Sequence, residues 1–120
     1  MEIKLIYYLI KFLKSKIGNR TKTMKRFTQR NNLYFIRNGG PGPVTSLIKI
    51  GYSKDPSNRL KQLQVGNPVR LELRTTIGVS NGYQAENNAH QYFSDKRVNG
   101  EWFELTEKSI NDYIFNFPNE

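Results

Sequence analysis

Hydrophobic positions recur along the chain with two different periods, and together they predict an α+β fold. Residues typical of strands, many of them alternating with polar ones, predict strands over 33–37, 45–52 and 69–79. Apolar residues three and four positions apart predict a helix over 3–17. Further helices are predicted from a start at 53–56 to a stop at 66–68, from about 82 to 96, and over 107–115. A further short strand fits residues 101–105. Because Gly and Pro crowd residues 38–43, we expect a loop there that joins the first two strands into an antiparallel pair.

The same pattern predicts which strand residues share a face, because successive side chains point to opposite sides of a sheet. One face of the second strand is expected to carry Leu47, Lys49 and Gly51. One face of the third strand is expected to carry Leu71, Leu73, Thr75 and Ile77. The run Ser53-Lys54-Asp55-Pro56 predicts the start of the helix that follows the second strand, with Ser53 or Asp55 as the cap and Pro in the first turn.

Composition narrows the classes of protein that the chain can represent. It has 120 residues, no cysteine and one histidine, which excludes disulfides and zinc sites with several His or Cys ligands. Its length suits a domain over residues 33–120, preceded by a basic helix and arm over residues 1–32. Frequent Asn, Lys and Ile are typical of AT-rich genomes and point to a phage, virus or bacterium. We therefore expect a cytoplasmic location, or the nucleus or a viral factory for a eukaryotic virus.

Charge is concentrated at the N-terminal end. The net charge is +9, and residues 1–32 hold nine of the 19 Lys and Arg residues beside one acid, Glu2. Such a basic arm predicts an anionic partner, with nucleic acid first, an anionic membrane second, and a merely soluble basic protein as the plain alternative. The candidate DNA contacts are Lys11, Lys14, Lys22, Lys25, Arg26 and Arg30.

The predicted N-terminal helix over 3–17 has three compatible placements. It can pack on the core or on a second copy of the chain, lie on a membrane surface, or direct its lysines along DNA phosphates. It is too short and too charged to span a bilayer, which takes about 20 apolar residues. We favour packing on the core or a homodimer through this helix, and we do not expect a membrane partner.

Four polar residues match the chemical needs of phosphodiester cleavage, which are a base, a cation for the phosphate and a carboxylate for a metal ion. These are Tyr34 on the first strand, Lys49 on the second, Arg59 on the next helix and Glu86 on the helix after that. His90 lies one turn after Glu86 on the same helical face. This set predicts a nuclease, and the resemblance described next implies that its substrate is DNA and its metal ion Mg²⁺ or Mn²⁺.

In their order and spacing, five short motifs resemble those of the GIY-YIG nuclease superfamily, in its KIG-type branch from phages, bacteria, large DNA viruses and fungi. They are Leu33-Tyr34-Phe35, Lys49-Ile50-Gly51, Asp55-Pro56 followed by Arg59-Leu60, Glu86 with His90, and Gly100-Glu101-Trp102-Phe103. The resemblance covers roughly residues 33–115. It implies a small three-stranded antiparallel sheet flanked by helices, and metal-dependent endonuclease cleavage of one DNA strand per active site.

The resemblance also implies a role for each side chain. Tyr34 would take a proton from water, and Lys49 would favour the ionised phenol or act as the base itself. Arg59 would bind the scissile phosphate, and Glu86 would hold the Mg²⁺. His90 joins this catalytic set, although filling a half-buried gap is its simpler interpretation.

Ordinary structural roles compete with these assignments. Arg59 could pair with Asp55 one turn earlier, and Glu86 could form a salt bridge on its helix. Leu63 stands where the family has His or Tyr, and Asn99 is the nearest residue to the family's late Asn. The alternative function is therefore a DNA-binding or adaptor module that has the fold without the chemistry.

Overall fold

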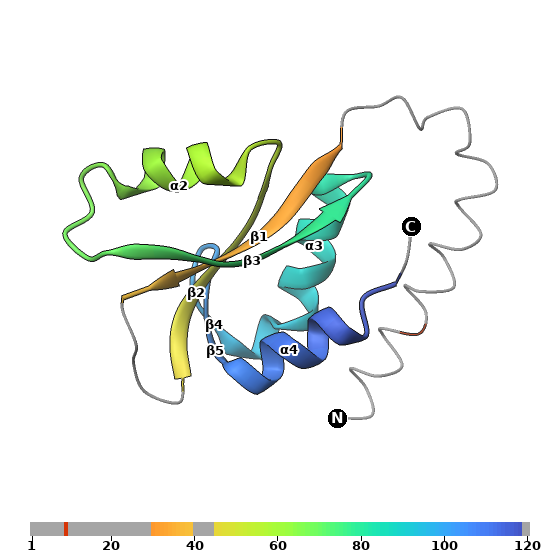
Figure 1. Cartoon of the computed structure of the whole chain (residues 1–120). Helices are drawn as coiled ribbons and strands as arrows, with labels where there is room; N and C mark the ends of the chain where they lie inside the picture. The colour runs from red at the N-terminus through yellow and green to blue at the C-terminus, as the bar shows by residue number, and fades with distance from the viewer. Residues whose placement is uncertain (1–8, 10–29, 40–44, 119–120) are drawn as a thin grey trace.

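A five-stranded antiparallel sheet forms the centre of the computed structural model (Figure 1). The structure describes Leu9 and residues 30–39 and 45–118. Within that part the elements are, in chain order, β1 (Asn31–Asn38), β2 (Thr45–Ser53), α2 (Pro56–Gln64), β3 (Leu71–Val79), α3 (Gly82–Tyr92), a short 3-10 turn (Ser94–Lys96), β4 (Arg97–Asn99), β5 (Trp102–Thr106) and α4 (Glu107–Phe115). The strands lie in the order β3-β1-β2-β5-β4.

The expected three-stranded sheet is wrong, although the α+β class and the first three strands were predicted. β5 pairs antiparallel with residues 45–49 of β2, and β4 adds a fifth strand beyond it. The physical reason is that Phe103 and Leu105 continue the apolar face of β2 into the same core, so burying them requires β5 to join the sheet. β4 gave no hydrophobic signal because its three residues are all exposed.

Helices cover both faces of the sheet. Figure 1 shows α3 and α4 on one side and α2 on the other. The α3/α4 side buries the larger cluster, which includes Leu33, Phe35, Ile48, Ile50, Ala89, Phe93, Phe103, Ile110 and Tyr113. The α2 side buries Tyr34, Ile36 and Leu71, with Leu60, Leu63, Leu73 and Trp102 packed against them. The predicted face of Leu47, Lys49 and Gly51 is thus confirmed, because Ile48 and Ile50 point to the opposite side.

The predicted face for the third strand is wrong, because β3 contains a β-bulge. Phe35 pairs with Thr75 and Ile36 with Leu73, so Arg74 is an extra residue between them. One extra residue moves every following side chain to the other face. Leu71 and Leu73 therefore lie on the α2 side, whereas Ile77 and Val79 pack into the α3/α4 cluster.

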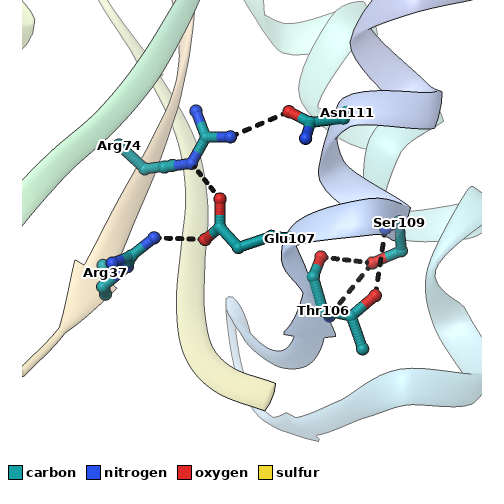
Figure 2. A network of polar contacts seen from close by, with 6 residues as sticks. All are labelled: Arg37, Arg74, Thr106, Glu107, Ser109 and Asn111. Atoms are coloured by element: carbon teal, nitrogen blue, oxygen red, sulfur yellow. Dashed lines mark hydrogen bonds and ion pairs between the residues drawn. The ribbon is translucent and has the colours of Figure 1, made fainter. Parts of the chain in front are cut away.

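Polar contacts fix the helix ends. The Asp55 side chain accepts a hydrogen bond from the Asn58 N–H at the start of α2, as predicted. At the start of α4, Thr106 and Ser109 form a capping box. Figure 2 shows the adjacent Glu107 carboxylate between Arg37 of β1 and Arg74 of β3, which ties α4 to the sheet.

Two expectations lie outside this description. Apart from Leu9, the predicted helix over 3–17 falls in residues that the structure does not describe, and so does most of the basic arm. Among the described helices, none is long and apolar enough to cross a membrane.

Candidate active site

Tyr34 lies across the neighbouring strand β2. It pairs with Gly51, and a Cβ atom built on Gly51 would lie 2.6 Å from Cζ of the Tyr34 ring and 3.0 Å from Cε1. The ring thus occupies the space that any other side chain at position 51 would need. Because Tyr34 is 2% exposed, its phenol is held in one place over β2, on the α2 side of the sheet.

Lys49 lies on the same face as Tyr34, two residues before Gly51. In this diagonal arrangement the two residues are roughly 7–8 Å apart at the backbone, which long side chains can bridge. The Lys49 Nζ is 2.9 Å from the Glu101 Oε1 and 5.8 Å from the centre of the Trp102 ring. One carboxylate and one aromatic face, both on the β5 side of β2, therefore fix the position of the ammonium.

The edge of β2 beyond the end of β5 is bound by side chains of α3. The last contact with the turn before β5 is the Ile50 N–H, which donates to the Glu101 carbonyl at 3.0 Å. The Ile50 carbonyl oxygen lies 2.9 Å from the His90 Nε2. Further along, the Tyr52 N–H donates to the Glu86 carboxylate. The predicted pair Glu86 and His90 thus takes over the backbone groups that β5 leaves unpaired.

Glu86 lies among several charged groups. Burial raises the pKa of its carboxyl above the ordinary value, and the nearby Glu101 carboxylate raises it further. The charges of His90 and Lys49, and the hydrogen bond from Tyr52, act in the opposite direction. Two carboxylates and a lysine therefore meet at this edge, where a bound cation would relieve the repulsion between the carboxylates.

His90 has a structural contact that the sequence could not reveal. Its Nε2 faces the Ile50 carbonyl, and its ring centre lies 5.0 Å from that of Phe103. In a neutral ring the proton is then on Nε2, because a carbonyl oxygen only accepts hydrogen bonds. This contact holds α3 against β2 one helical turn after Glu86. It involves only Nε2 of the ring, so Nδ1 is available for a further partner.

Arg59 is not brought into this group. It lies on an exposed side of α2, and its guanidinium donates to the Gln62 Oε1 at 3.3 Å. Within the described residues, none of its contacts connects it to Tyr34, Lys49 or Glu86. The competing ion pair with Asp55 is also not formed there, since the Asp55 carboxylate caps α2.

The predicted DNA-contacting arm is mostly outside the described residues. Lys11, Lys14, Lys22, Lys25 and Arg26 lie in the part that is not described, and their role stays a prediction. Arg30 is described, is exposed, and directly precedes β1.

Glu101 is the residue of this cluster that sequence reasoning left out of the site. Its side chain pairs with Lys49, its carbonyl pairs with Ile50, and its charge acts on Glu86. The only signal was its place in Gly100-Glu101-Trp102-Phe103. Gly100 has φ +55 in the turn between β4 and β5, and this turn carries Glu101 to the edge of β2.

The donor set suits a metal ion that needs few protein ligands. Among residues 30–39 and 45–118, no group of three or more His, Asp or Glu side chains could hold a metal ion. Mg²⁺ commonly takes only one or two carboxylates and completes its shell with water and phosphate oxygens. Glu86, with Glu101 close by, fits that requirement.

Comparison with protein families gives one match. Residues 31–117 match the T5orf172 domain, and the chain belongs to this phage-associated family, which is linked to nucleases. Comparisons with curated proteins and with solved structures found no match. The family is consistent with a DNA-binding or nuclease-like module.

Proposed function

We propose that this member of the T5orf172 domain family is a metal-dependent DNA endonuclease of the GIY-YIG type, which hydrolyses one strand per active site. One observation carries the proposal. Tyr34, Lys49 and Glu86 come from three separate elements and converge on residues 49–52 of β2. A phenol, an ammonium and a half-buried carboxylate within one short stretch of strand are the groups that phosphodiester hydrolysis requires.

The residues divide the chemistry between them. The Tyr34 phenolate acts as general base: it takes a proton from the attacking water and becomes the neutral phenol. The Lys49 ammonium stabilises the phenolate that is needed for this step, and the Glu101 carboxylate holds that ammonium in position. Gly51 lets the phenol lie flat against β2, so the base has little freedom to leave its position.

Glu86 is the proposed metal ligand, with Glu101 as a second carboxylate beside it. These carboxylates would hold Mg²⁺ or Mn²⁺, which when bound would supply positive charge near the leaving oxygen of the phosphodiester. The hydrogen bond from the Tyr52 N–H fixes the Glu86 carboxylate, and the contact of His90 with Ile50 fixes the helix that carries it.

Arg59 and the N-terminal arm are proposed to act on the DNA backbone. Arg59 is exposed on α2, the helix that covers the same face of the sheet as Tyr34. A phosphate that lies over this face could draw the guanidinium away from Gln62, since arginine binds phosphate oxygens with two parallel hydrogen bonds. The arm adds affinity without sequence preference, and this contribution falls as salt rises.

A DNA-binding module without catalysis is the second candidate, and one observation favours it. Leu63 packs in the apolar cluster under α2, at the position where the resembled nucleases carry His or Tyr. A site that lacks this polar group has one fewer hydrogen bond for the phosphate or the attacking water. Binding without cleavage is the outcome expected from this candidate.

Relaxation of supercoiled plasmid tests the proposal. Purified protein is assayed with Mg²⁺ and with EDTA, beside the variants Glu86→Gln, Lys49→Met and Arg59→Ala. Asp112→Asn is the matched control, because it also removes a carboxylate charge, but from an exposed ion pair on α4. We expect Mg²⁺-dependent nicking by the wild type and the control, and a loss of at least about 100-fold in each site variant.

Two results would contradict the proposal. Nicking that persists in Glu86→Gln at the wild-type rate would remove the metal-ligand role. Absence of nicking by the wild type, with tight and salt-sensitive plasmid binding, would support the binding module instead.

A further inference from the structure

Two exposed tyrosines lie next to the candidate site, and the site chemistry uses neither ring. Tyr52 on β2 is 40% exposed and Tyr83 on α3 is 63% exposed. Large aromatic side chains are costly to leave in water, so a pair of them at one place calls for an explanation. Both belong to elements that also carry the site, since the Tyr52 N–H bonds to Glu86 of α3.

The Tyr52 ring is fixed by the start of α3. A Cβ atom built on Gly82 would lie 2.8 Å from Cγ of Tyr52 and 3.0 Å from Cβ of Asn31. The absence of a side chain at Gly82 thus allows the ring to lie directly on the helix backbone. Tyr83 follows Gly82 in sequence, so both tyrosines belong to the same corner of the fold, where β1 and α3 begin and β2 ends.

Two exposed cations lie at this corner. Arg30 precedes β1 and Lys54 follows β2, and both are exposed. Two acids lie close to Tyr52: Glu86, whose carboxylate accepts a hydrogen bond from the Tyr52 N–H, and Asp55, whose carboxylate caps α2 through Asn58. Exposed aromatic rings between cations are the combination that binds single-stranded nucleic acid, because bases stack on the rings while the cations follow the phosphates.

We propose that Tyr52 and Tyr83 form a stacking platform for unpaired bases, so that the preferred substrate is DNA with a single-stranded segment next to the cut. This inference rests on the proposed nuclease function for its biological setting. The platform itself binds DNA without metal and without catalysis. The Tyr52 N–H bonds to the Glu86 carboxylate, so the platform lies beside the proposed metal ligand, whereas the Tyr34 phenol is held on the opposite face of the sheet.

The test is fluorescence anisotropy with the full chain in EDTA. One probe is a labelled single strand of about 12 thymidines, within the range of site sizes of such proteins, and the other is a duplex of the same length. Tyr52→Ala and Tyr83→Ala should each raise the Kd for the single strand about 5- to 100-fold. Tyr83→Phe keeps the stacking face and should bind like the wild type.

Phe115→Ala is the matched control, because Phe115 is 87% exposed at the end of α4, away from this corner. It should leave the Kd for both probes unchanged. Tyr83 is largely exposed, so its variants are expected to fold, and circular dichroism verifies this. The proposal is overturned if Tyr83→Ala binds the single strand like the wild type, or if it weakens the duplex by the same factor.

Plasmid nicking measured in parallel separates this inference from the nuclease assignment. One possible result is that the Tyr52→Ala and Tyr83→Ala variants lose single-strand binding selectively while the wild type does not nick the plasmid. That result would support the platform and contradict the nuclease. Mg²⁺-dependent nicking together with unchanged single-strand binding in both Ala variants would support the nuclease and contradict the platform.

Discussion

Replacing Gly51 with alanine tests the placement of Tyr34, on which the candidate site depends. The new Cβ would lie 2.6 Å from Cζ of the tyrosine and closer still to its hydroxyl oxygen. The ring is rigid and 2% exposed, so it cannot turn aside into solvent. Either the ring or the β1–β2 pairing must therefore shift.

The expected cost follows from two opposing effects. Inserting a methyl group into a packed position costs typically about 1–3 kcal/mol. Alanine also reduces the conformational entropy of the unfolded chain and has a higher strand propensity than glycine. These effects stabilise the folded state by about 0.5–1 kcal/mol. We therefore expect Gly51→Ala to lower the free energy of unfolding by about 1–2 kcal/mol. For a domain of this size that corresponds to a Tm lower by roughly 4–15 °C.

Gly78→Ala is the matched control. Gly78 also lies in a strand of the same sheet, and a Cβ built on it has no atom within 4 Å. The same chemical change should therefore be neutral or stabilise by up to about 1 kcal/mol. Urea unfolding followed by circular dichroism gives both free energies under identical conditions.

A double-mutant cycle identifies the cause. In a Tyr34→Leu background the atoms nearest to the new Cβ are gone, so Gly51→Ala should lose most of its penalty. The reasoning is refuted if Gly51→Ala is as stable as the wild type. It is also refuted if the penalty is the same in the wild-type and Tyr34→Leu backgrounds, since the contact would then not be its source.

Three further predictions concern charge. Glu107→Gln should lower the free energy of unfolding by about 1 kcal/mol, since it breaks two partly exposed ion pairs, with Arg37 and Arg74. Burial acts to raise the pKa of Glu107, but these two arginines hold it below the ordinary 4.5. The stability that Glu107 contributes is therefore present above pH 4.5 and lost as pH falls through the lowered pKa. In urea unfolding, the difference in free energy between the variant and the wild type should thus be larger at pH 7 than at pH 3. The pH dependence of Glu86 runs the other way, because burial and Glu101 raise its pKa above 4.5. The folded state therefore loses stability as pH rises through the raised pKa. Over that rise, the free energy of unfolding of Glu86→Gln should increase relative to that of the wild type. Because a metal ion needs the ionised carboxylate, Mn²⁺ affinity measured by calorimetry should weaken as pH falls through the same raised pKa, and this pH dependence should be absent from Glu86→Gln.

Local pattern was enough to predict most of the individual elements. α4 begins and ends at the predicted residues, and α2 starts at Asp55, one of its two predicted caps. The errors arose where a single residue decides the arrangement of many. Arg74 forms the bulge that reverses the faces of β3, and nothing in its neighbourhood departs from ordinary strand composition. β4 is three exposed residues long, which is too short for any period to be recognised.

The candidate site was harder to predict because its geometry depends on where one strand stops. β5 pairs with β2 only as far as Lys49, opposite Trp102. From Ile50 onward the edge of β2 offers an unpaired carbonyl and an unpaired N–H, and α3 satisfies them with His90 and Glu86. Sequence spacing placed Glu86 and His90 on one helical face, but it could not reveal that the backbone of β2 is their partner.

The turn before β5 brings Glu101 to the same edge, so the length of β5 determines both the carboxylate pair and the contact that holds Lys49. A longer β5 would pair with residues 50–52 of β2. The Tyr52 N–H would then donate to β5 and would no longer be available to the Glu86 carboxylate.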